Sequence, residues 1–205
     1  MKTKIYFVRH GETVWNTERR YQGWTDIELS DVGIKQAELL GERFKNINID
    51  KIYVSPLKRA IQTAEPISKV TGITPIITEN FKEINFGEWE GGTVSELTEK
   101  YGETFTKFFE NPPAHPFPGD GSFKNVEKRI IKGLEKIFNE DKGKNVLIVS
   151  HGGLLKIMCL YLMELSGDFY RKIWIDNASI SLIEVNDKGK KLLRTLNDRA
   201  HLENE

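Results

Sequence analysis

Short apolar segments that alternate with helix-like segments constrain the fold of this chain more than any other feature. Residues 5–8 (Ile-Tyr-Phe-Val) and 145–149 (Asn-Val-Leu-Ile-Val) are almost entirely apolar and rich in β-branched residues, as is typical of strands buried on both faces. Residues 51–54 and 74–78 have the composition of two further short strands. Strands that alternate with helices predict an α/β fold, with three α/β/α layers around a mostly parallel central sheet.

Helix signals occupy the segments between these strands. Ser30 and Ser55 are typical N-cap residues, and Pro56 suits the first position of the helix after Ser55. Apolar residues then recur at helical spacing behind both serines. Two more helices are expected over residues 123–139 and 154–163.

Residues 81–122 differ in composition from the rest of the chain, because they are rich in glycine, proline and aromatic residues. A long excursion of this kind in a compact domain is often a functional lid. We therefore expect a single domain over residues 1–205, with 81–122 inserted as a small cap. A β-hairpin over 179–185 and 191–196 would complete the domain.

The charge balance excludes several classes of partner. Acidic and basic residues number 30 each, so no long-range positive field is expected to attract nucleic acid or a membrane surface. The single cysteine, Cys159, cannot form an intrachain disulfide, which suits a reducing compartment. No segment resembles a signal peptide or a membrane span, and we expect a cytoplasmic protein.

Two histidines follow predicted strands, and both precede a glycine. His10 comes after the first strand and His151 after the strand at 145–149. Ligands of open α/β sheets bind at this carboxyl edge. Arg9 adjoins His10, and Arg59 lies in the first turn of a predicted helix, where an anion is favoured. Any one of these residues alone is more often structural, but together they predict a site for a phosphoryl group.

Five sequence blocks carry a resemblance to a known family. In order along the chain they are residues 7–13, 21–26, 55–60, 83–91 and 149–153. The first reads Phe-Val-Arg-His-Gly-Glu-Thr and the last Val-Ser-His-Gly-Gly. Together they resemble the histidine phosphatase superfamily, also called phosphoglycerate mutase-like, over nearly the whole chain.

The resemblance implies a phosphatase that works through a covalent intermediate. His10 would be the nucleophile and form a phosphohistidine. Glu83 would protonate the leaving alkoxide and later take a proton from the attacking water. Arg9, Arg59 and His151 would hold the phosphoryl oxygens and stabilise the charge of the transition state.

The same resemblance implies further contacts and a class of ligand. Asn16, Gln22, Thr13 and Gly152 would bind the substrate or its phosphate. The partner would be a small phosphorylated substrate. The protein would be a monomer or homodimer, and it would need no metal or other cofactor. Composition alone does not select Glu83, because other acidic residues lie near it in the sequence.

Two features leave the substrate open. Gly121 stands where the family block commonly has a glutamate before the serine, here Ser122. The missing carboxylate is expected to alter the pocket rim or a local salt bridge. Arg19 and Arg20 form a basic pair that is usually exposed charge, although it could meet a second anionic group of a substrate.

Several functions therefore remain in view. Hydrolysis of small phosphorylated metabolites is the leading prediction, and the alternatives are a cofactor-dependent phosphoglycerate mutase and an α-ribazole phosphatase. The insertion is short and poor in cations, which favours hydrolysis over the mutase. A non-catalytic binding protein would have lost a catalytic side chain, and none is lost here. Dinucleotide binding is excluded, since no Gly-x-Gly-x-x-Gly follows the first strand.

Overall fold

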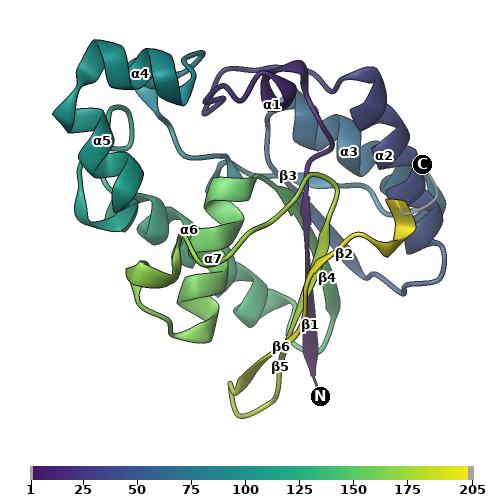
Figure 1. The fold of residues 1–205 in the computed structure, drawn as a ribbon. Coiled ribbons are helices and arrows are strands. Elements are labelled where there is room, and N and C mark those ends of the chain that lie inside the picture. The colour runs from purple at the N-terminus through teal and green to yellow at the C-terminus, as the bar shows by residue number, and fades with distance from the viewer. Residues whose placement is uncertain (1, 203–205) are drawn as a thin grey trace.

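A six-stranded sheet runs through the centre of the computed structural model, which describes residues 2–202 (Figure 1). The strand order is β3-β2-β4-β1-β5-β6. The strands are β1 (Thr3–Arg9), β2 (Lys51–Val54), β3 (Ile76–Ile77), β4 (Asn145–Ser150), β5 (Ile180–Val185) and β6 (Lys191–Asp198). The first four run parallel and the last two pair antiparallel. The mostly parallel sheet expected from the sequence is thereby confirmed.

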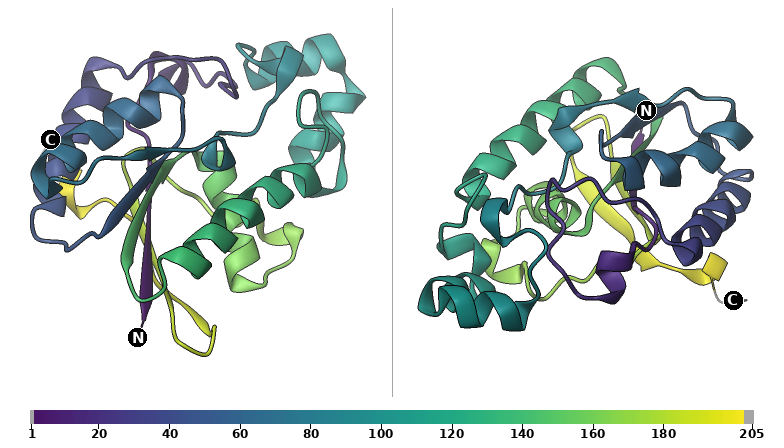
Figure 2. Two further views of the ribbon diagram at one scale, coloured as in Figure 1. Left: turned by 180° about the vertical axis from the view of Figure 1, so that it is seen from behind. Right: turned by 90° about the horizontal axis from the view of Figure 1, so that it is seen from above.

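Helices cover both faces of the sheet (Figure 2). They are α1 (Val14–Thr17), α2 (Asp31–Phe44), α3 (Lys58–Thr71), α6 (Phe123–Glu140) and α7 (Gly152–Met163). Successive residues of a strand point to opposite faces. In β4, Val146 and Ile148 accordingly pack into the core beneath α6 and α7, while Leu147 and Val149 pack beneath α2 and α3. A strand buried on both faces must be apolar throughout, which explains the sequence pattern.

Register brings the ends of β1 and β4 together. The two strands are direct parallel neighbours, with Val8 opposite Val149 and Arg9 opposite Ser150. The next residue on each strand, His10 and His151, therefore emerges at the same point of the carboxyl edge. The fold thus fixes the two histidines beside each other before any side-chain contact is considered.

Between β3 and α6 the chain leaves the sheet. This segment contains α4 (Val94–Tyr101), α5 (Glu103–Glu110) and three short 3-10 helices (Glu79–Phe81, Gly87–Trp89 and Pro112–Ala114). Figure 1 shows α4 and α5 away from the sheet, on the same side as α6 and α7. Trp89 packs against Phe105 and Phe108, with ring centroids 5.1 and 4.9 Å apart. These buried aromatic side chains form the core of the segment.

Some local expectations differ from the structure. β3 is limited to Ile76 and Ile77 rather than 74–78, because it is an edge strand and both side chains are exposed. The segment 164–179 between α7 and β5 contains a 3-10 helix (Gly167–Phe169) that was not predicted, and another (Ala200–Leu202) follows β6. Within residues 2–202, none of the helices has the length and apolar character needed to cross a bilayer.

Candidate active site

The two imidazole rings at the carboxyl edge of the sheet lie close together and out of contact with solvent. The ring centroids of His10 and His151 are 5.2 Å apart. Only 3% of His10 and none of His151 is exposed. Both residues therefore act in an environment that the protein controls, with His10 at the wall of a cavity of about 220 Å3.

A single hydrogen bond sets the tautomer of His10. Its Nδ1 lies 2.6 Å from the carbonyl oxygen of Gly11, which can only accept, so Nδ1 carries the hydrogen. The lone pair is then on Nε2, where a nucleophile is needed. Burial, followed by the positive charges of Arg59 and Arg9, holds the pKa of His10 well below its usual range. The ring is thus neutral at neutral pH.

His151 is held by a residue that directly follows β2, the neighbour of β4 on the side away from β1. Its Nε2 is 2.7 Å from the hydroxyl oxygen of Ser55, and its buried Nδ1 has no partner within residues 2–202. Burial, Arg59 and His10 lower its pKa well below the usual range. The prediction that Ser55 caps a helix is wrong: α3 begins at Lys58 after Leu57, and the Ser55 hydroxyl is used on His151 instead.

Two arginines near the histidines each have an N–H donor that makes no hydrogen bond to the described residues. Arg59 is fully buried and donates to the carbonyl oxygens of Thr25 (2.9 Å) and Gly23 (2.7 Å). Arg9 donates to the carbonyl of Ile175 at 2.7 Å. Nε of each arginine is buried without a partner among the described residues. Burial lowers the pKa of Arg59 to about 10, so it stays charged, and such donors suit an anion.

Glu83 approaches the cavity from the segment between β3 and α6, and its carboxylate contacts the start of α7. One carboxylate oxygen accepts from the backbone N–H of Ile84 (3.0 Å) and Leu154 (2.9 Å), and the other from that of Gly153 (3.3 Å). A Cβ on Gly153 would lie 3.0 Å from the Glu83 carboxylate. The second glycine after His151 therefore makes room for the acid.

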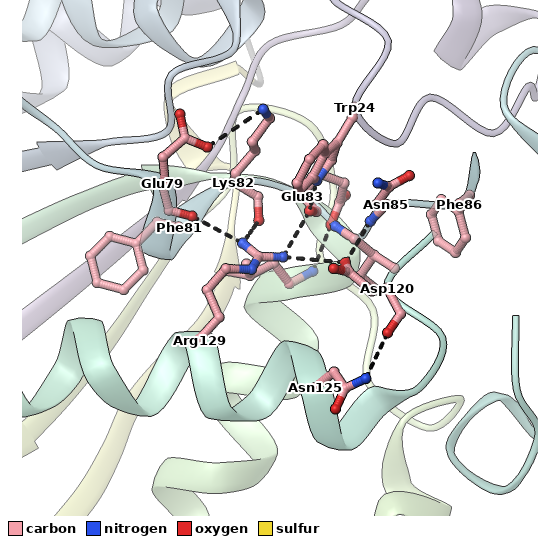
Figure 3. A network of polar contacts seen from close by, with 12 residues as sticks. Trp24, Glu79, Phe81, Lys82, Glu83, Asn85, Phe86, Asp120, Asn125 and Arg129 are labelled. Atoms are coloured by element: carbon pink, nitrogen blue, oxygen red, sulfur yellow. Dashed lines mark hydrogen bonds and ion pairs between the residues drawn. The ribbon is translucent and has the colours of Figure 1, made fainter. Parts of the chain in front are cut away.

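The backbone of Glu83 is held by a separate network (Figure 3). Arg129 on α6 donates to the carbonyl oxygens of Lys82 and, at 3.0 Å, Glu83. The indole N–H of Trp24 donates to the same Glu83 carbonyl at 2.7 Å. Arg129 also pairs with Asp120, at 3.5 Å. Glu83 is thus fixed from both sides by residues that do not touch the cavity.

Gly121 directly follows Asp120 of this network, in a backbone conformation that favours glycine. This residue has φ +77°, in the left-handed region where a glutamate would be strained. The carboxylate of the preceding residue, Asp120, accepts from the N–H of Asn85 at 2.7 Å and pairs with Arg129. A salt bridge is therefore present directly before Gly121, although neither Asp120 nor Arg129 lines the cavity.

The predicted neutral contacts divide into two groups. Asn16, Gln22 and Gly152 line the cavity. Thr13 does not; its buried side chain caps α1, and its N–H and hydroxyl both donate to Oδ1 of Asn16 at 3.0 Å. That oxygen is therefore occupied, and the Asn16 amide N–H2 is left for a ligand. Gly152 makes room for Arg9, whose Nε would lie 3.1 Å from a Cβ there.

Several residues of the site carried no signal in the sequence. Asn177 donates to the carbonyl oxygens of His10 (3.0 Å) and Gly11 (3.2 Å) and to Asn16 (3.2 Å). Tyr170 and Trp174, from the same segment 164–179, line the cavity with Lys156 of α7. They come from a loop without a motif, and only the folded chain brings them to the histidines.

The side chains gathered here have the chemistry needed to bind and transfer a phosphoryl group. Among residues 2–202, no cluster of three or more His, Cys, Asp or Glu side chains could hold a metal ion. Of the predicted catalytic residues, His10, Arg9 and Glu83 line a cavity large enough for a small phosphomonoester, whereas His151 and Arg59 are fully buried and do not line it. Cys159 is buried, and burial raises the pKa of its thiol to about 12, so it is not a nucleophile.

Comparison with known proteins agrees with this chemistry. Residues 5–198 match the Histidine phosphatase superfamily (branch 1). Phosphoserine phosphatase 1 of Hydrogenobacter thermophilus is 35% identical over 97% of this chain and 94% of its own. The metal-independent phosphoserine phosphatase of Arabidopsis thaliana is also 35% identical, over 98% and 83%. A crystal structure of Entamoeba histolytica phosphoserine phosphatase with 3-phosphoglyceric acid superposes with a TM-score of 0.87 at 35% identity, covering 98% and 99%. The chain belongs to the histidine phosphatase superfamily and is an enzyme that hydrolyses phosphoric monoesters.

Proposed function

We propose that His10 is the residue that becomes phosphorylated. The observation that carries this assignment is the hydrogen bond from Nδ1 to the Gly11 carbonyl, which leaves the Nε2 lone pair at the cavity. Nε2 attacks phosphorus, the N–P bond forms and the bond to the leaving oxygen breaks. Because the ring is neutral at neutral pH, it needs no prior deprotonation.

Glu83 handles the proton in both halves of the reaction. Its carboxyl group gives a proton to the leaving alkoxide as the phosphohistidine forms. It then accepts a proton from the water that attacks phosphorus, and the N–P bond breaks to release phosphate. The backbone donors of α7 keep the carboxyl group in one position throughout the cycle.

The charge of the phosphoryl group is met by Arg9, Arg59 and His151. The unused Nε donors of the arginines and the unpartnered Nδ1 of His151 are already desolvated, so they stabilise the transition state without further reorganisation. Asn16 and Gln22 add uncharged contacts at the same wall. No step in this scheme needs a metal ion.

Phosphoserine is the substrate we propose. Several relatives with similar length and identity carry that activity in their names. The cavity, about 220 Å3, is small and lined by Arg9, Arg20 and Lys156, which suits a compact polar leaving group. Phosphoglycerate mutation and α-ribazole phosphate hydrolysis are the alternatives, since proteins named for them are 29% and 25% identical to this chain.

Phosphate release from phosphoserine in the presence of EDTA tests the assignment. We expect turnover by the wild type and a loss of at least about 10⁴-fold in kcat for His10→Ala. Brief incubation with 32P-labelled substrate should label the wild type in an acid-labile, base-stable form and leave His10→Ala unlabelled. Interconversion of phosphoglycerates with little free phosphate, or loss of activity on adding EDTA, would overturn the proposal.

A further inference from the structure

A second cavity adjoins the catalytic one, and Lys156 lies where the two meet. The second cavity is about 340 Å3 and its wall is mainly aromatic. Both cavities are lined by Phe86, Lys156, Tyr170 and Trp174. A leaving group that extends from a phosphoryl group bound at His10 toward the second cavity therefore passes this lysine.

The ammonium group of Lys156 lies against aromatic rings. It lies 4.0 Å from the ring centroid of Tyr170 and 5.6 Å from that of Trp174. Within residues 2–202 it forms no ion pair with an Asp or Glu. Burial, then Arg171 and Arg9, lowers its pKa to about 8, against the opposing charge of Glu83. It is still protonated at neutral pH, and a half-buried cation is costly unless an anion joins it.

The other cations near the cavities are already engaged. Arg20 pairs with Glu18 (2.6 Å) and Glu96 (3.0 Å). Arg171 lies over the ring of Phe109 and donates to that residue's carbonyl oxygen. Arg9 and Arg59 serve the phosphoryl group under the proposed function. Among the described residues, Lys156 is the one cation that lines both cavities.

We infer that Lys156 binds a carboxylate on the leaving group and so selects phosphate monoesters of hydroxy acids. This inference rests on the proposed function, because the phosphoryl group must first be placed at His10. A carboxylate is favoured over a second phosphate for two reasons. The catalytic cavity of about 220 Å3 must hold the phosphoryl group as well. A lone ammonium also lacks the paired donors with which arginine matches phosphate oxygens.

Substrate pairs that differ only at the carboxylate provide the test. The first pair is phosphoserine and phosphoethanolamine, and the second is 3-phosphoglycerate and glycerol 3-phosphate. Lys156→Met keeps the bulk of the side chain and removes the charge. We expect kcat/KM for the carboxylated member of each pair to fall about 10- to 100-fold, with less than about twofold change for its partner. Lys156→Arg should recover most of the loss.

Lys172→Met is the matched control, since this exposed lysine lies over Phe169 and lines neither cavity. It should leave both pairs unchanged. Equal losses on both members of a pair would assign Lys156 to general phosphate binding and overturn the inference. The inference would also be overturned if the preference for the carboxylated substrate were lost in Arg171→Gln but kept in Lys156→Met. Failure of the proposed function is distinguishable, because then no substrate would depend on His10.

Discussion

At the scale of single residues, the loss of rate caused by removing the acid Glu83 should depend on the leaving group of the substrate. Glu83→Gln keeps the size of the side chain but cannot give a proton to the leaving oxygen. We expect kcat for phosphoserine, whose leaving alkoxide is strongly basic, to fall about 10²- to 10⁴-fold. For p-nitrophenyl phosphate, whose leaving phenolate needs little protonation, the loss should stay below about tenfold. Steady-state kinetics on both substrates measures the difference.

Glu88→Gln is the natural comparison for that variant. Glu88 lies in the same sequence block, but its side chain is exposed and does not line the cavity. Its removal should leave both rates within about twofold, in the range of surface substitutions. If Glu83→Gln slows both substrates to the same degree, Glu83 binds or positions the substrate rather than transferring a proton.

Residues at strand ends were predictable from the sheet pattern, and loop residues such as Glu83 and Gln22 only from the resemblance. The loop residues outside the matching sequence blocks were not predicted. His10, His151 and Arg9 directly follow or end buried strands, so the sheet alone places them. Asn177, which donates to the backbone of His10, lies 167 residues away in sequence, within a segment that has no periodic pattern. Lys156 is one cation among many in the sequence, and only its burial against Tyr170 sets it apart.

At the scale of elements, Asp141 links the end of α6 to β2 and to the residue before β4. Its fully buried carboxylate accepts from Tyr53 of β2 at 2.7 Å and lies 2.9 Å from the ammonium groups of Lys51 and Lys144. Burial acts to raise its pKa, but these hydrogen bonds outweigh burial and lower it. Asp141→Asn should reduce the free energy of unfolding by about 1–3 kcal/mol, because the two lysines are partly exposed. Urea denaturation measures this change.

A surface ion pair supplies the contrast for Asp141. Lys45 and Glu42 are 2.6 Å apart at the end of α2, with both side chains at least half exposed. Lys45→Met should change stability by less than about 0.5 kcal/mol. Phosphatase activity should be unchanged in both variants at temperatures where they are folded, since neither residue lines the cavity. Equal destabilisation by the two substitutions would show that the Asp141 cluster adds nothing beyond ordinary surface charge.

The elements themselves were predicted unevenly. β1 and β4 were recognisable because burial on both faces demands unbroken apolar sequence. β3 has only two residues at the exposed edge, so its sequence is under no such demand. Residues 81–122 were predicted as an aromatic-rich cap, without separating the aromatic residues that pack inside it from those that line a cavity. Trp89 and Phe105 lie in its core, whereas Phe86 also lines both cavities, a distinction that needs the path of the chain.

At the scale of the whole molecule, catalysis and stability share the same buried rings. Burial and two nearby arginines hold the pKa values of His10 and His151 well below the ordinary value of 6.5. The unfolded chain therefore binds more protons than the folded one between those lowered values and pH 6.5. Stability from the neutral rings is complete above pH 6.5 and falls as the pH drops below it. Each ring contributes up to about 1.4 kcal/mol per pH unit.

Urea denaturation at pH 7.5 and 5.5 should therefore show a loss of about 1–3 kcal/mol in the wild type. Few other groups with a shifted pKa change protonation in this interval. Carboxylates with a lowered pKa, such as Asp141, affect stability at lower pH, and Lys156 affects it at higher pH. His201, whose pKa is also lowered by burial, contributes in the same direction, so His201→Gln is measured alongside. The double variant His10→Asn, His151→Asn should lose less than half as much as the wild type. An unchanged pH dependence in the double variant would mean that the two rings are not held neutral by the fold, and the readiness of His10 as a nucleophile would then need another source.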